Sequence, residues 1–463
     1  MGGLEMRAGW ARAEITPTQP GITLSGFASR RNQPSEGIDD PLWVNALAVE
    51  EAGECVLVLV FDLLGLGSEI TDLIQHSLDA AIGIPRRNRI LCCTHTHSAP
   101  ATVRLIGCGI EDPSYWRIVV RGALEAARSA VENMRPARLR YATVGVKNLS
   151  YNRRKLLRGG RVTMTQFPDE PVLKEGPVWD RFFLARFEDE SDRGICGIAH
   201  WAAHACTVGA MRVSADYPGR LRELLADYYG LPFIFLQGAC GNINPPLGDM
   251  TRDRMLRNAD SLVREVVGAG FDQPVDTQPF FLADSKLRLS YGPIPSPEEL
   301  RRIREGMSVI AETGSGPQEA VALLADILNT RPGDQPDPDA LRHTASLVRE
   351  WAEGLLARDA PDAAADGCDL SVAVWRVGPI AFCFVAAEVF VETAIALQEA
   401  FPDLIVNAVG YASPLVGYLP TDEALDEGGY ESACAFMFYG RPAPFAKGSE
   451  PAVSAALRSL MGA

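Results

Sequence analysis

Short, continuous apolar runs recur along the chain, with stretches of helical periodicity between some of them. The apolar runs predict buried strands at residues 42–49, 55–61, 89–93, 137–143, 181–187, 231–237, 369–376, 378–385 and 404–410. Residues 68–81 and 114–134 instead repeat their apolar positions with the period of an amphipathic helix. The alternation predicts an α/β fold in which mixed β-sheets are flanked by helices.

Residues 296–359 differ from the rest, because they are charged and helical in pattern. Ser296 is a good N-cap and Pro297 suits the first helical turn, while residues 331–336 (RPGDQP) break the region. We expect two or three helices packed outside the main body, where they could cover a site. No internal repeat, low-complexity tract or interdomain linker is visible. Residues 1–463 are therefore expected to form a single domain with this helical insertion.

Four of the six histidines occur in two closely spaced pairs at the ends of apolar runs. His95 and His97 follow the run 89–93, and in an extended backbone alternate side chains share a face. His200 and His204 are four residues apart, a spacing that shares a face on a helix and on a strand. Imidazoles gathered in this way favour a metal site. The alternative is a set of hydrogen-bonded histidines at strand ends.

Other polar features also stand where apolar runs end. Asp62 and Glu388 each follow such a run. Asp62 either serves a site or caps a turn or helix, and Glu388 is either a metal ligand or a partner of a helix N-terminus. Residues 238–246 (GACGNINPP) follow the run 231–237 as a glycine-rich turn, whose N–H groups could approach a ligand. It is not a phosphate loop, because the Lys and Ser/Thr of that motif are absent. The basic stretch that contains Arg153 could hold an anionic or carbonyl oxygen, or be a solvated loop.

Composition and charge mainly exclude function classes. Apolar residues make up 47% and charged residues 22% of the 463, as in ordinary globular enzymes. The net charge of −15 argues against nucleic acid and against an anionic membrane surface as partners. No apolar run could span a membrane and no secretion signal is visible. The ten cysteines lack metal-type spacing, which indicates buried thiols in a reducing compartment. We expect a cytoplasmic protein with a small-molecule substrate and no stable membrane insertion.

Taken in chain order, these residues resemble the neutral/alkaline non-lysosomal ceramidase family. The resemblance rests on Asp62, THTHSAP at 94–100, His204, GNINP at 241–245, Glu388, GYLPT at 417–421 and Tyr430-Glu431. It covers nearly the whole chain. Members of that family are zinc-dependent amidases with a catalytic domain followed by an immunoglobulin-like domain. The resemblance therefore implies one zinc-hydrolase catalytic domain here, without the immunoglobulin-like domain.

The same resemblance implies a set of site residues. Zinc is the implied cofactor, and its implied ligands are His95, His204, Glu388 and Tyr418. The implied catalytic residues around the scissile group are His97, Arg153 and Tyr430. A phenol such as that of Tyr418 is a poor ligand unless the metal lowers its pKa from about 10, so this ligand rests on the resemblance alone.

One position departs from the family pattern. The family has a serine in the glycine-rich turn where this chain has Asn244, and asparagine cannot be a nucleophile of that kind. Its amide is expected, together with Gly241 and Asn242, to bind substrate or stabilise an oxyanion. We expect zinc-activated water to cleave a carbon–nitrogen (amide) bond in a substrate other than ceramide. The alternatives are a metal-dependent lyase or isomerase of a polar small molecule, and a metal-binding homologue without activity.

Overall fold

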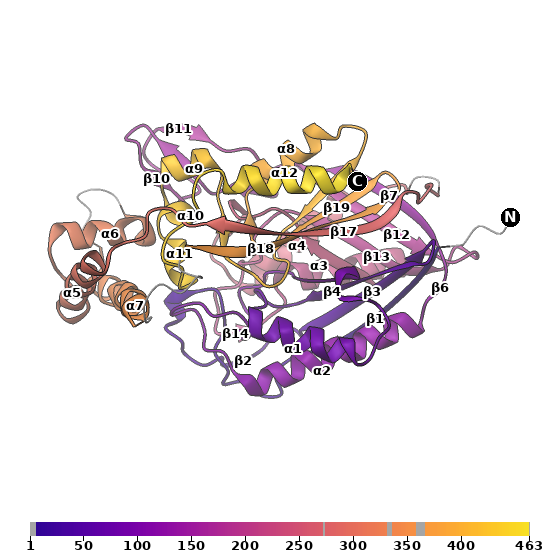
Figure 1. Ribbon diagram of the computed structural model, residues 1–463, viewed down its shortest axis with the longest axis horizontal. Helices are drawn as coiled ribbons and strands as arrows, with labels where there is room; N and C mark the ends of the chain where they lie inside the picture. The colour runs from indigo at the N-terminus through magenta and orange to yellow at the C-terminus, as the bar shows by residue number, and fades with distance from the viewer. Residues whose placement is uncertain (1–5, 272–273, 331–335, 358–365, 463) are drawn as a thin grey trace.

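Three sheets of the computed structural model repeat one connectivity (Figure 1). The structure describes residues 6–271, 274–330, 336–357 and 366–462. In each sheet three neighbouring strands run antiparallel, and a helix then leads to a fourth strand that lies parallel to the third. The sequence shows no matching repeat, so the three units share topology alone.

The three units follow one another along the chain. The first consists of β1 (Arg7–Glu14), β3 (Trp43–Glu51), β4 (Glu54–Phe61), α1 (Ser68–Asp79) and β5 (Arg89–Cys93), with β6 (Arg135–Pro136) beside β1. The second consists of β7 (Arg138–Gly145), β12 (Arg181–Glu188), β13 (Gly194–Trp201), α3 (Asp216–Tyr229) and β15 (Phe233–Gln237). The third consists of β17 (Phe280–Ser290), β18 (Gly367–Val377), β19 (Ile380–Val385), α8 (Val391–Ala400) and β21 (Ile405–Val409). Because each helix crosses over between parallel strands, the carboxyl ends of the third and fourth strands lie at one edge of their sheet.

All three sheets contribute side chains to one apolar cluster. Its fully buried members include Val58 of β4, Phe183 of β12 and Trp375 of β18. Single bridges also join the sheets near their strand ends, where Cys92 pairs with Ala412 and Gly238 pairs with Val409. The strand ends of different units are thereby held close together.

Helices cover the outer faces of the sheets (Figure 1). α1 and α2 (Pro113–Glu132) pack on the first sheet, and a Cβ at Gly9 of β1 would lie 2.1 Å from the carbonyl oxygen of Ala130. Glycine is therefore required there for close packing. α4 (Arg252–Val266) packs on α3, and α12 (Ser449–Met461) lies along β17 and β18.

Three more helices form a layer at one end of the molecule (left in Figure 1). They are α5 (Pro297–Thr313), α6 (Gln318–Leu328) and α7 (Pro338–Leu356). α5 starts with a capping box in which Ser296 and Glu299 bond reciprocally. The expected break at 331–336 and the end of the expected insertion at 358–359 lie largely outside the described residues.

The remaining elements are short. Paired strands are β2 (Gly37–Ile38) with β14 (Arg212–Val213), β8 (Tyr151–Asn152) with β16 (Ile243–Asn244), and β20 (Glu388–Val389) with β22 (Tyr418–Leu419). A small sheet holds β9 (Lys155–Leu157), β10 (Val162–Thr163) and β11 (Val172–Glu175). Short helices are Ala28–Arg30, Arg86–Asn88, α9 (Asp422–Glu427), α10 (Tyr430–Ala433) and α11 (Ala435–Phe438). The basic stretch that contains Arg153 thus lies among short strands.

The predicted α/β class with mixed sheets is confirmed, and most predicted elements have their ends within a few residues of the observed ones. The hydrophobic pattern does not predict β1 or α4, among others. β1 (RAGWARAE) carries small residues where α2 packs closely, so it has no continuous apolar run. α4 is highly charged and buries only a narrow apolar stripe.

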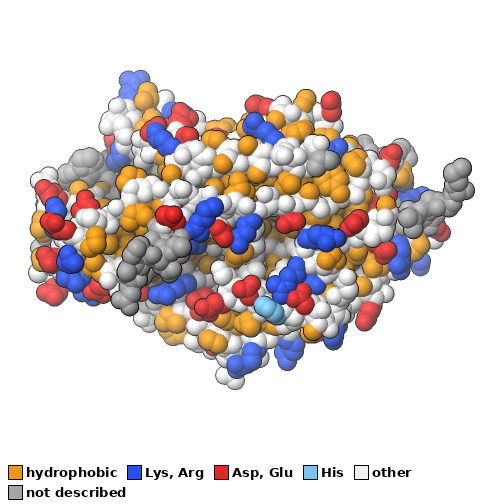
Figure 2. Space-filling model, viewed as in Figure 1, with side chains coloured by type: hydrophobic (Ala, Val, Ile, Leu, Met, Phe, Trp, Pro, Cys, Tyr) orange, Lys and Arg blue, Asp and Glu red, His pale blue; other side chains and the backbone are white. Residues whose placement is uncertain are grey.

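The surface mixes both charge signs. On the face shown in Figure 2, acidic and basic side chains are interspersed. Among the described residues, no helix has the length and hydrophobicity needed to cross a membrane.

We predict that the denatured protein titrates ten thiols and that the native protein titrates almost none quickly. All ten cysteines are free, and nine of them are buried. Burial raises the pKa of Cys92 to about 12 and, with Glu50 adding to the effect, the pKa of the half-buried Cys55 to about 11. Reaction with a thiol reagent, with and without denaturant, measures this. A denatured count of eight or fewer would instead reveal disulfides.

Candidate metal centre

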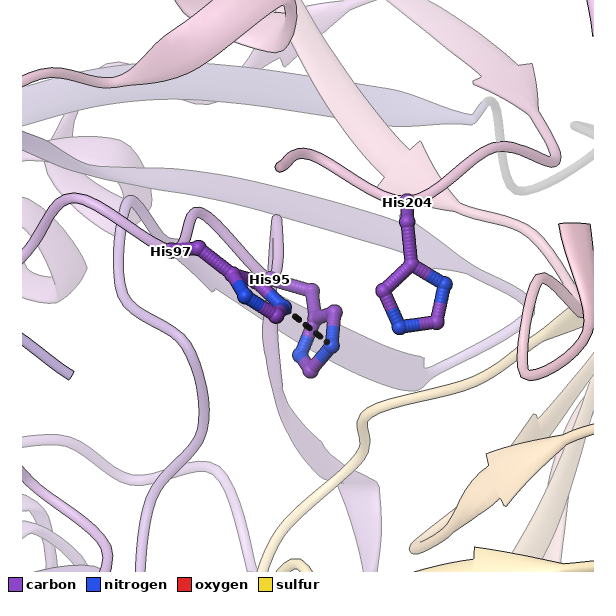
Figure 3. A group of neighbouring side chains, drawn as sticks. All are labelled: His95, His97 and His204. Atoms are coloured by element: carbon purple, nitrogen blue, oxygen red, sulfur yellow. Dashed lines mark hydrogen bonds between the residues drawn. The ribbon is translucent and has the colours of Figure 1, made fainter. Parts of the chain in front are cut away.

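Three histidine side chains converge near the strand ends (Figure 3). One ring nitrogen from each of His95, His97 and His204 lies within 4.8 Å of the others. The Nε2 atoms of His95 and His97 are 3.2 Å apart. His95 and His204 are buried, and His97 is half-buried. The group is therefore nearly closed from solvent and opens on the His97 side.

Each of the three units supplies one side chain to this place. His95 stands two residues beyond β5 of the first unit, while His204 and Glu388 each stand three residues beyond the third strand of the second and third units. The backbone at His95 has φ of +63°, a left-handed conformation that costs about 1–3 kcal/mol for such a residue and is common at functional sites. The centre is thus assembled from strand ends, one from each sheet.

Hydrogen bonds fix the tautomers of two of the histidines. Nδ1 of His95 donates to the carbonyl oxygen of Leu64 at 2.8 Å, and Nδ1 of His204 donates to that of Cys240 at 2.6 Å. Both Nε2 atoms are therefore unprotonated in the neutral rings. They face Oε2 of Glu388, at 3.2 Å from His95 and 3.3 Å from His204.

This donor set fits a metal ion. Tetrahedral zinc has bonds of about 2.0–2.1 Å, which places neighbouring ligand atoms roughly 3.3 Å apart, close to the separations found. Among the described residues, Nε2 of His204 and Oε2 of Glu388 have no hydrogen-bond partner although both are buried. Without a cation, a carboxylate oxygen would face two nitrogen lone pairs. A divalent cation between them would resolve that conflict.

The protonation states also suit a metal. Burial lowers the pKa of His204 to about 4, and Arg153 adds to this effect. Burial alone would raise the pKa of Glu388, but the charge that His95 and His204 carry when they are protonated outweighs burial and holds that pKa well below its usual range. A neutral imidazole and a charged carboxylate at neutral pH are the forms that bind metals.

Two tyrosines support the centre, and the sequence analysis did not identify them. The hydroxyl of Tyr439 donates to Oε1 of Glu388 at 2.5 Å. The ring of Tyr411 stacks on that of His95, with centroids 3.9 Å apart, and its hydroxyl lies 3.0 Å from Sγ of Cys240. Tyr439 had no signal in the sequence. Tyr411 stands two residues beyond β21, which matches the place of His95 beyond β5.

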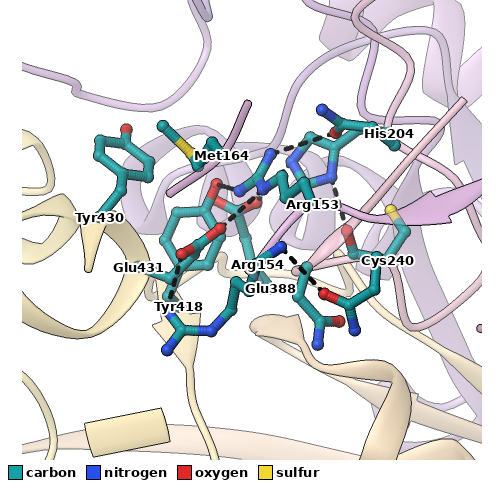
Figure 4. Close-up of polar contacts among 12 residues, drawn as sticks. Arg153, Arg154, Met164, His204, Cys240, Glu388, Tyr418, Tyr430 and Glu431 are labelled. Carbon is teal, nitrogen blue, oxygen red and sulfur yellow. Dashed lines mark hydrogen bonds and ion pairs between the residues drawn. The ribbon is translucent and has the colours of Figure 1, made fainter. Parts of the chain in front are cut away.

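Arg153 lies beside the centre and is held on three sides (Figure 4). Its Nε donates to Glu431 at 2.7 Å, its Nη2 donates to the Tyr418 hydroxyl at 2.9 Å, and its Nη1 lies 3.4 Å from Oδ1 of Asn244. Glu431 also accepts from Nη1 of Arg154 at 3.0 Å. Both arginines and Glu431 are buried. The basic stretch is therefore no solvated loop at these two positions.

Tyr418 and Tyr430 lie on the same side. The parallel pairing of β20 with β22 puts Tyr418 directly beside Glu388, and the rings of Tyr418 and Tyr430 are 6.0 Å apart. Burial, reinforced by Glu388, raises the pKa of Tyr418 well above its usual value, and burial likewise raises that of Tyr430. Both phenols are therefore protonated in the metal-free protein.

The three residues of the glycine-rich turn have different surroundings. Asn244 pairs with Tyr151 across β16 and β8, which brings its amide to Arg153. The Asn242 amide instead accepts from the Val391 N–H at the start of α8 and donates to Glu392, away from the histidines. A Cβ at Gly241 would lie 2.7 Å from the carbonyl oxygen of Glu388. This glycine lets the turn lie against the strand that carries Glu388.

Two sequence candidates lie outside the centre. The prediction that His200 shares a face with His204 is wrong, because β13 ends at Trp201 and the chain turns before His204. His200 instead has Nε2 2.9 Å from the carbonyl oxygen of Ala408. Asp62 forms a buried bidentate ion pair with Arg222, at 2.6 and 2.7 Å. Its role is structural.

Comparisons with known proteins agree with this picture. Residues 6–219 match the family model described as neutral/alkaline non-lysosomal ceramidase, N-terminal. That segment contains His95, His97, Arg153 and His204, while Glu388 and Tyr418 lie beyond it. No curated protein sequence matches the chain.

Solved structures extend the likeness over almost the whole chain. Neutral ceramidase from Pseudomonas aeruginosa superposes with a TM-score of 0.68 at 18% identity, covering 98% of this chain and 74% of that one. A ceramidase complexed with C2 gives the same TM-score and coverage at 17% identity. At such identities the likeness establishes the fold, and the family match supports a hydrolase. Residues 6–219 thus match the neutral/alkaline non-lysosomal ceramidase family, and the chain as a whole has the fold of neutral ceramidase.

Proposed function

We propose that this protein is a zinc-dependent amidohydrolase that acts on an amide other than ceramide. The observation that carries the proposal is the convergence of Nε2 of His95 and His204 on Oε2 of Glu388, at 3.2 and 3.3 Å. These three side chains would hold the zinc, with Tyr418 beside Glu388 as the fourth. When bound, zinc would supply Lewis acidity, which polarises a carbonyl group and lowers the pKa of water to about 7.

We assign proton transfer to His97 and Tyr430. A metal-bound histidine almost always donates its other N–H to a partner, but Nδ1 of His97 is buried with none among the described residues. Its tautomer is therefore free to change, which suits a proton carrier better than a ligand. The Tyr430 phenol is protonated because burial raises its pKa, so it can donate to a leaving amine.

We propose that Arg153 and Asn244 stabilise the oxyanion that develops during hydrolysis. Glu431 and the Tyr418 hydroxyl fix two of the guanidinium nitrogens of Arg153, so its remaining N–H groups are oriented before substrate arrives. Asn244 lies against it, where the family has its serine. Because the side-chain amide of Asn244 cannot act as a nucleophile and form an acyl-enzyme, water is the attacking group and no covalent adduct forms.

We treat residues 1–463 as one catalytic unit with α5–α7 as its insertion. Asn329, directly after α6, accepts from the Thr163 hydroxyl of β10 at 2.9 Å. α6 also contacts α10, whose first residue is Tyr430. The helical layer therefore adjoins the proposed site.

The test combines metal analysis with turnover in labelled water. The purified protein should contain about one zinc per chain and cleave at least one member of a panel of N-acyl amides that includes ceramide. Oxygen-18 from solvent should enter the released carboxylate. Turnover without label would favour a lyase or isomerase. Metal without turnover of any amide or ester would favour a binding homologue.

Asn244→Ala is predicted to lower kcat by about 10²–10³, as removal of one oxyanion donor does, and to leave the metal content unchanged. Steady-state kinetics on the best amide measures this. Asn133→Ala, an exposed position at the end of α2, is the control and should keep full activity. A trapped acyl adduct on any serine, Ser98 included, would contradict the assignment of water as nucleophile.

A further inference from the structure

A separate cavity of about 640 Å³ lies between the first sheet and α3. Its walls include Trp10 and Arg12 of β1, Trp43 and Asn45 of β3, and Phe233 at the start of β15. None of the side chains that line it belongs to the metal centre. Its volume is in the usual range of small-molecule sites.

The strand face that lines this cavity changes character along its length. Arg12 pairs with Asn45 across β1 and β3, so side chains alternate and Trp10, Arg12, Trp43 and Asn45 share one face. Further along the same face, Leu47 of β3 belongs to the apolar cluster between the sheets. The buried amide of Asn45 therefore stands where an ordinary core would continue, while Arg12 beside it is exposed.

The cavity offers unpaired N–H donors. Among the described residues, Nε1 of Trp10, Nδ2 of Asn45 and Nε of Arg220 are buried without hydrogen-bond partners, and all three residues line the cavity. Asn45 is only 2% exposed. A buried donor left unpaired is destabilising, so a ligand oxygen that reached any of these N–H groups would stabilise it.

The charged side chains that line the cavity also bear on the kind of ligand it could bind. Arg12 makes no ion pair with a described residue, and its guanidinium lies 4.0 Å above the ring of Trp43. The acidic side chains of the lining are engaged or exposed: Asp40 bonds Arg252, Glu223 bonds Arg220, and Asp227 is exposed. Arg12 and Asp227, both exposed, are therefore the charged side chains of the lining without an ion pair to a described residue, and of the two it is Arg12 that lies over a tryptophan ring.

We propose that this cavity is a second binding site, for a small aromatic carboxylate. The flat apolar body would lie against Trp10, Trp43 and Phe233, as aromatic rings pack on one another. The carboxylate would accept from Asn45 and pair with Arg12, which is a strong charge-assisted arrangement. The site is independent of the hydrolysis proposed above.

The probe is 2-naphthoate, titrated into the full-length protein by calorimetry and by tryptophan fluorescence. One site per chain with a Kd of about 1 mM or tighter is expected, as for a small ligand. The neutral 2-naphthamide should bind at least about tenfold more weakly, because it lacks the charge. Equal binding of the amide, or no binding of the acid, would overturn the proposal. Binding of 2-naphthyl phosphate alone would show that the anion is a phosphate and not a carboxylate.

Substitutions of the lining residues test whether 2-naphthoate binds in this cavity. Arg12→Gln and Asn45→Leu should each weaken 2-naphthoate binding at least about tenfold, and Asn45→Leu should also raise the Tm because it removes an unpaired buried amide. Arg128→Gln, an exposed arginine on α2, is the matched control and should bind normally. Binding should also survive His204→Ala. Loss of 2-naphthoate binding in His204→Ala would place the ligand at the metal centre. Unchanged binding in both Arg12→Gln and Asn45→Leu would place it outside the cavity.

Discussion

His204→Ala is expected to lose the bound metal and, with it, at least about 10³-fold in kcat/KM. The substitution removes one nitrogen of the donor set and leaves Glu388 facing His95 alone. The Lewis acidity supplied by a catalytic metal is worth several kcal/mol, and about 4 kcal/mol corresponds to 10³-fold in rate. Elemental analysis should show a fall from about one metal ion per chain to almost none.

Two other histidines serve as controls for this experiment. His76 is exposed on α1, so His76→Ala should keep both metal and activity. His200 is buried on the strand that leads to His204, but it bonds Ala408 and not the cluster. His200→Gln should therefore keep the metal even if its Tm falls. Full metal content in His204→Ala, or loss of metal in His200→Gln, would mean that the centre is not the one described.

Arg153→Met is expected to lower kcat by about 10²–10³ while the metal stays bound. The guanidinium is proposed to stabilise the negative charge of the reacting group, and removing one such donor costs about that factor. Breaking its buried ion pair with Glu431 should also lower the free energy of unfolding, by about 3–5 kcal/mol. Kinetics at a temperature where the variant is folded, together with metal analysis, separates the two effects.

Arg154→Met is the matched control, because Arg154 bonds the same carboxylate. Its guanidinium extends to Glu427 and the carbonyl oxygen of Gly428, away from Tyr418 and Asn244. The variant should therefore lose a similar amount of stability but keep most of kcat. An equal loss of kcat in both variants would show that the arginines act only by holding the fold.

Much of the local structure and part of the centre follow from the sequence alone. Continuous apolar runs predicted nine of the twelve strands that make up the three repeated units, because a strand buried on both faces needs apolar residues at every position. Polar residues directly after those runs, such as His95, His204 and Glu388, were recognisable because strand ends are where function concentrates in α/β folds. Asn244 was identified by its place in a glycine-rich turn.

Only the tertiary structure decided which strand ends meet. The parallel pairing that sets Glu388 beside Tyr418 joins segments thirty residues apart, and no local pattern specifies such a register. The exclusion of His200 depended on where β13 ends, and the separation of Asn242 from Asn244 depended on the docking of α8. Tyr439 and Tyr411 are ordinary aromatic residues in the sequence, and they support the centre only because packing brings them to Glu388 and His95. Periodicity reports whether a residue is buried, but its neighbours across the core are set by long-range packing and pairing.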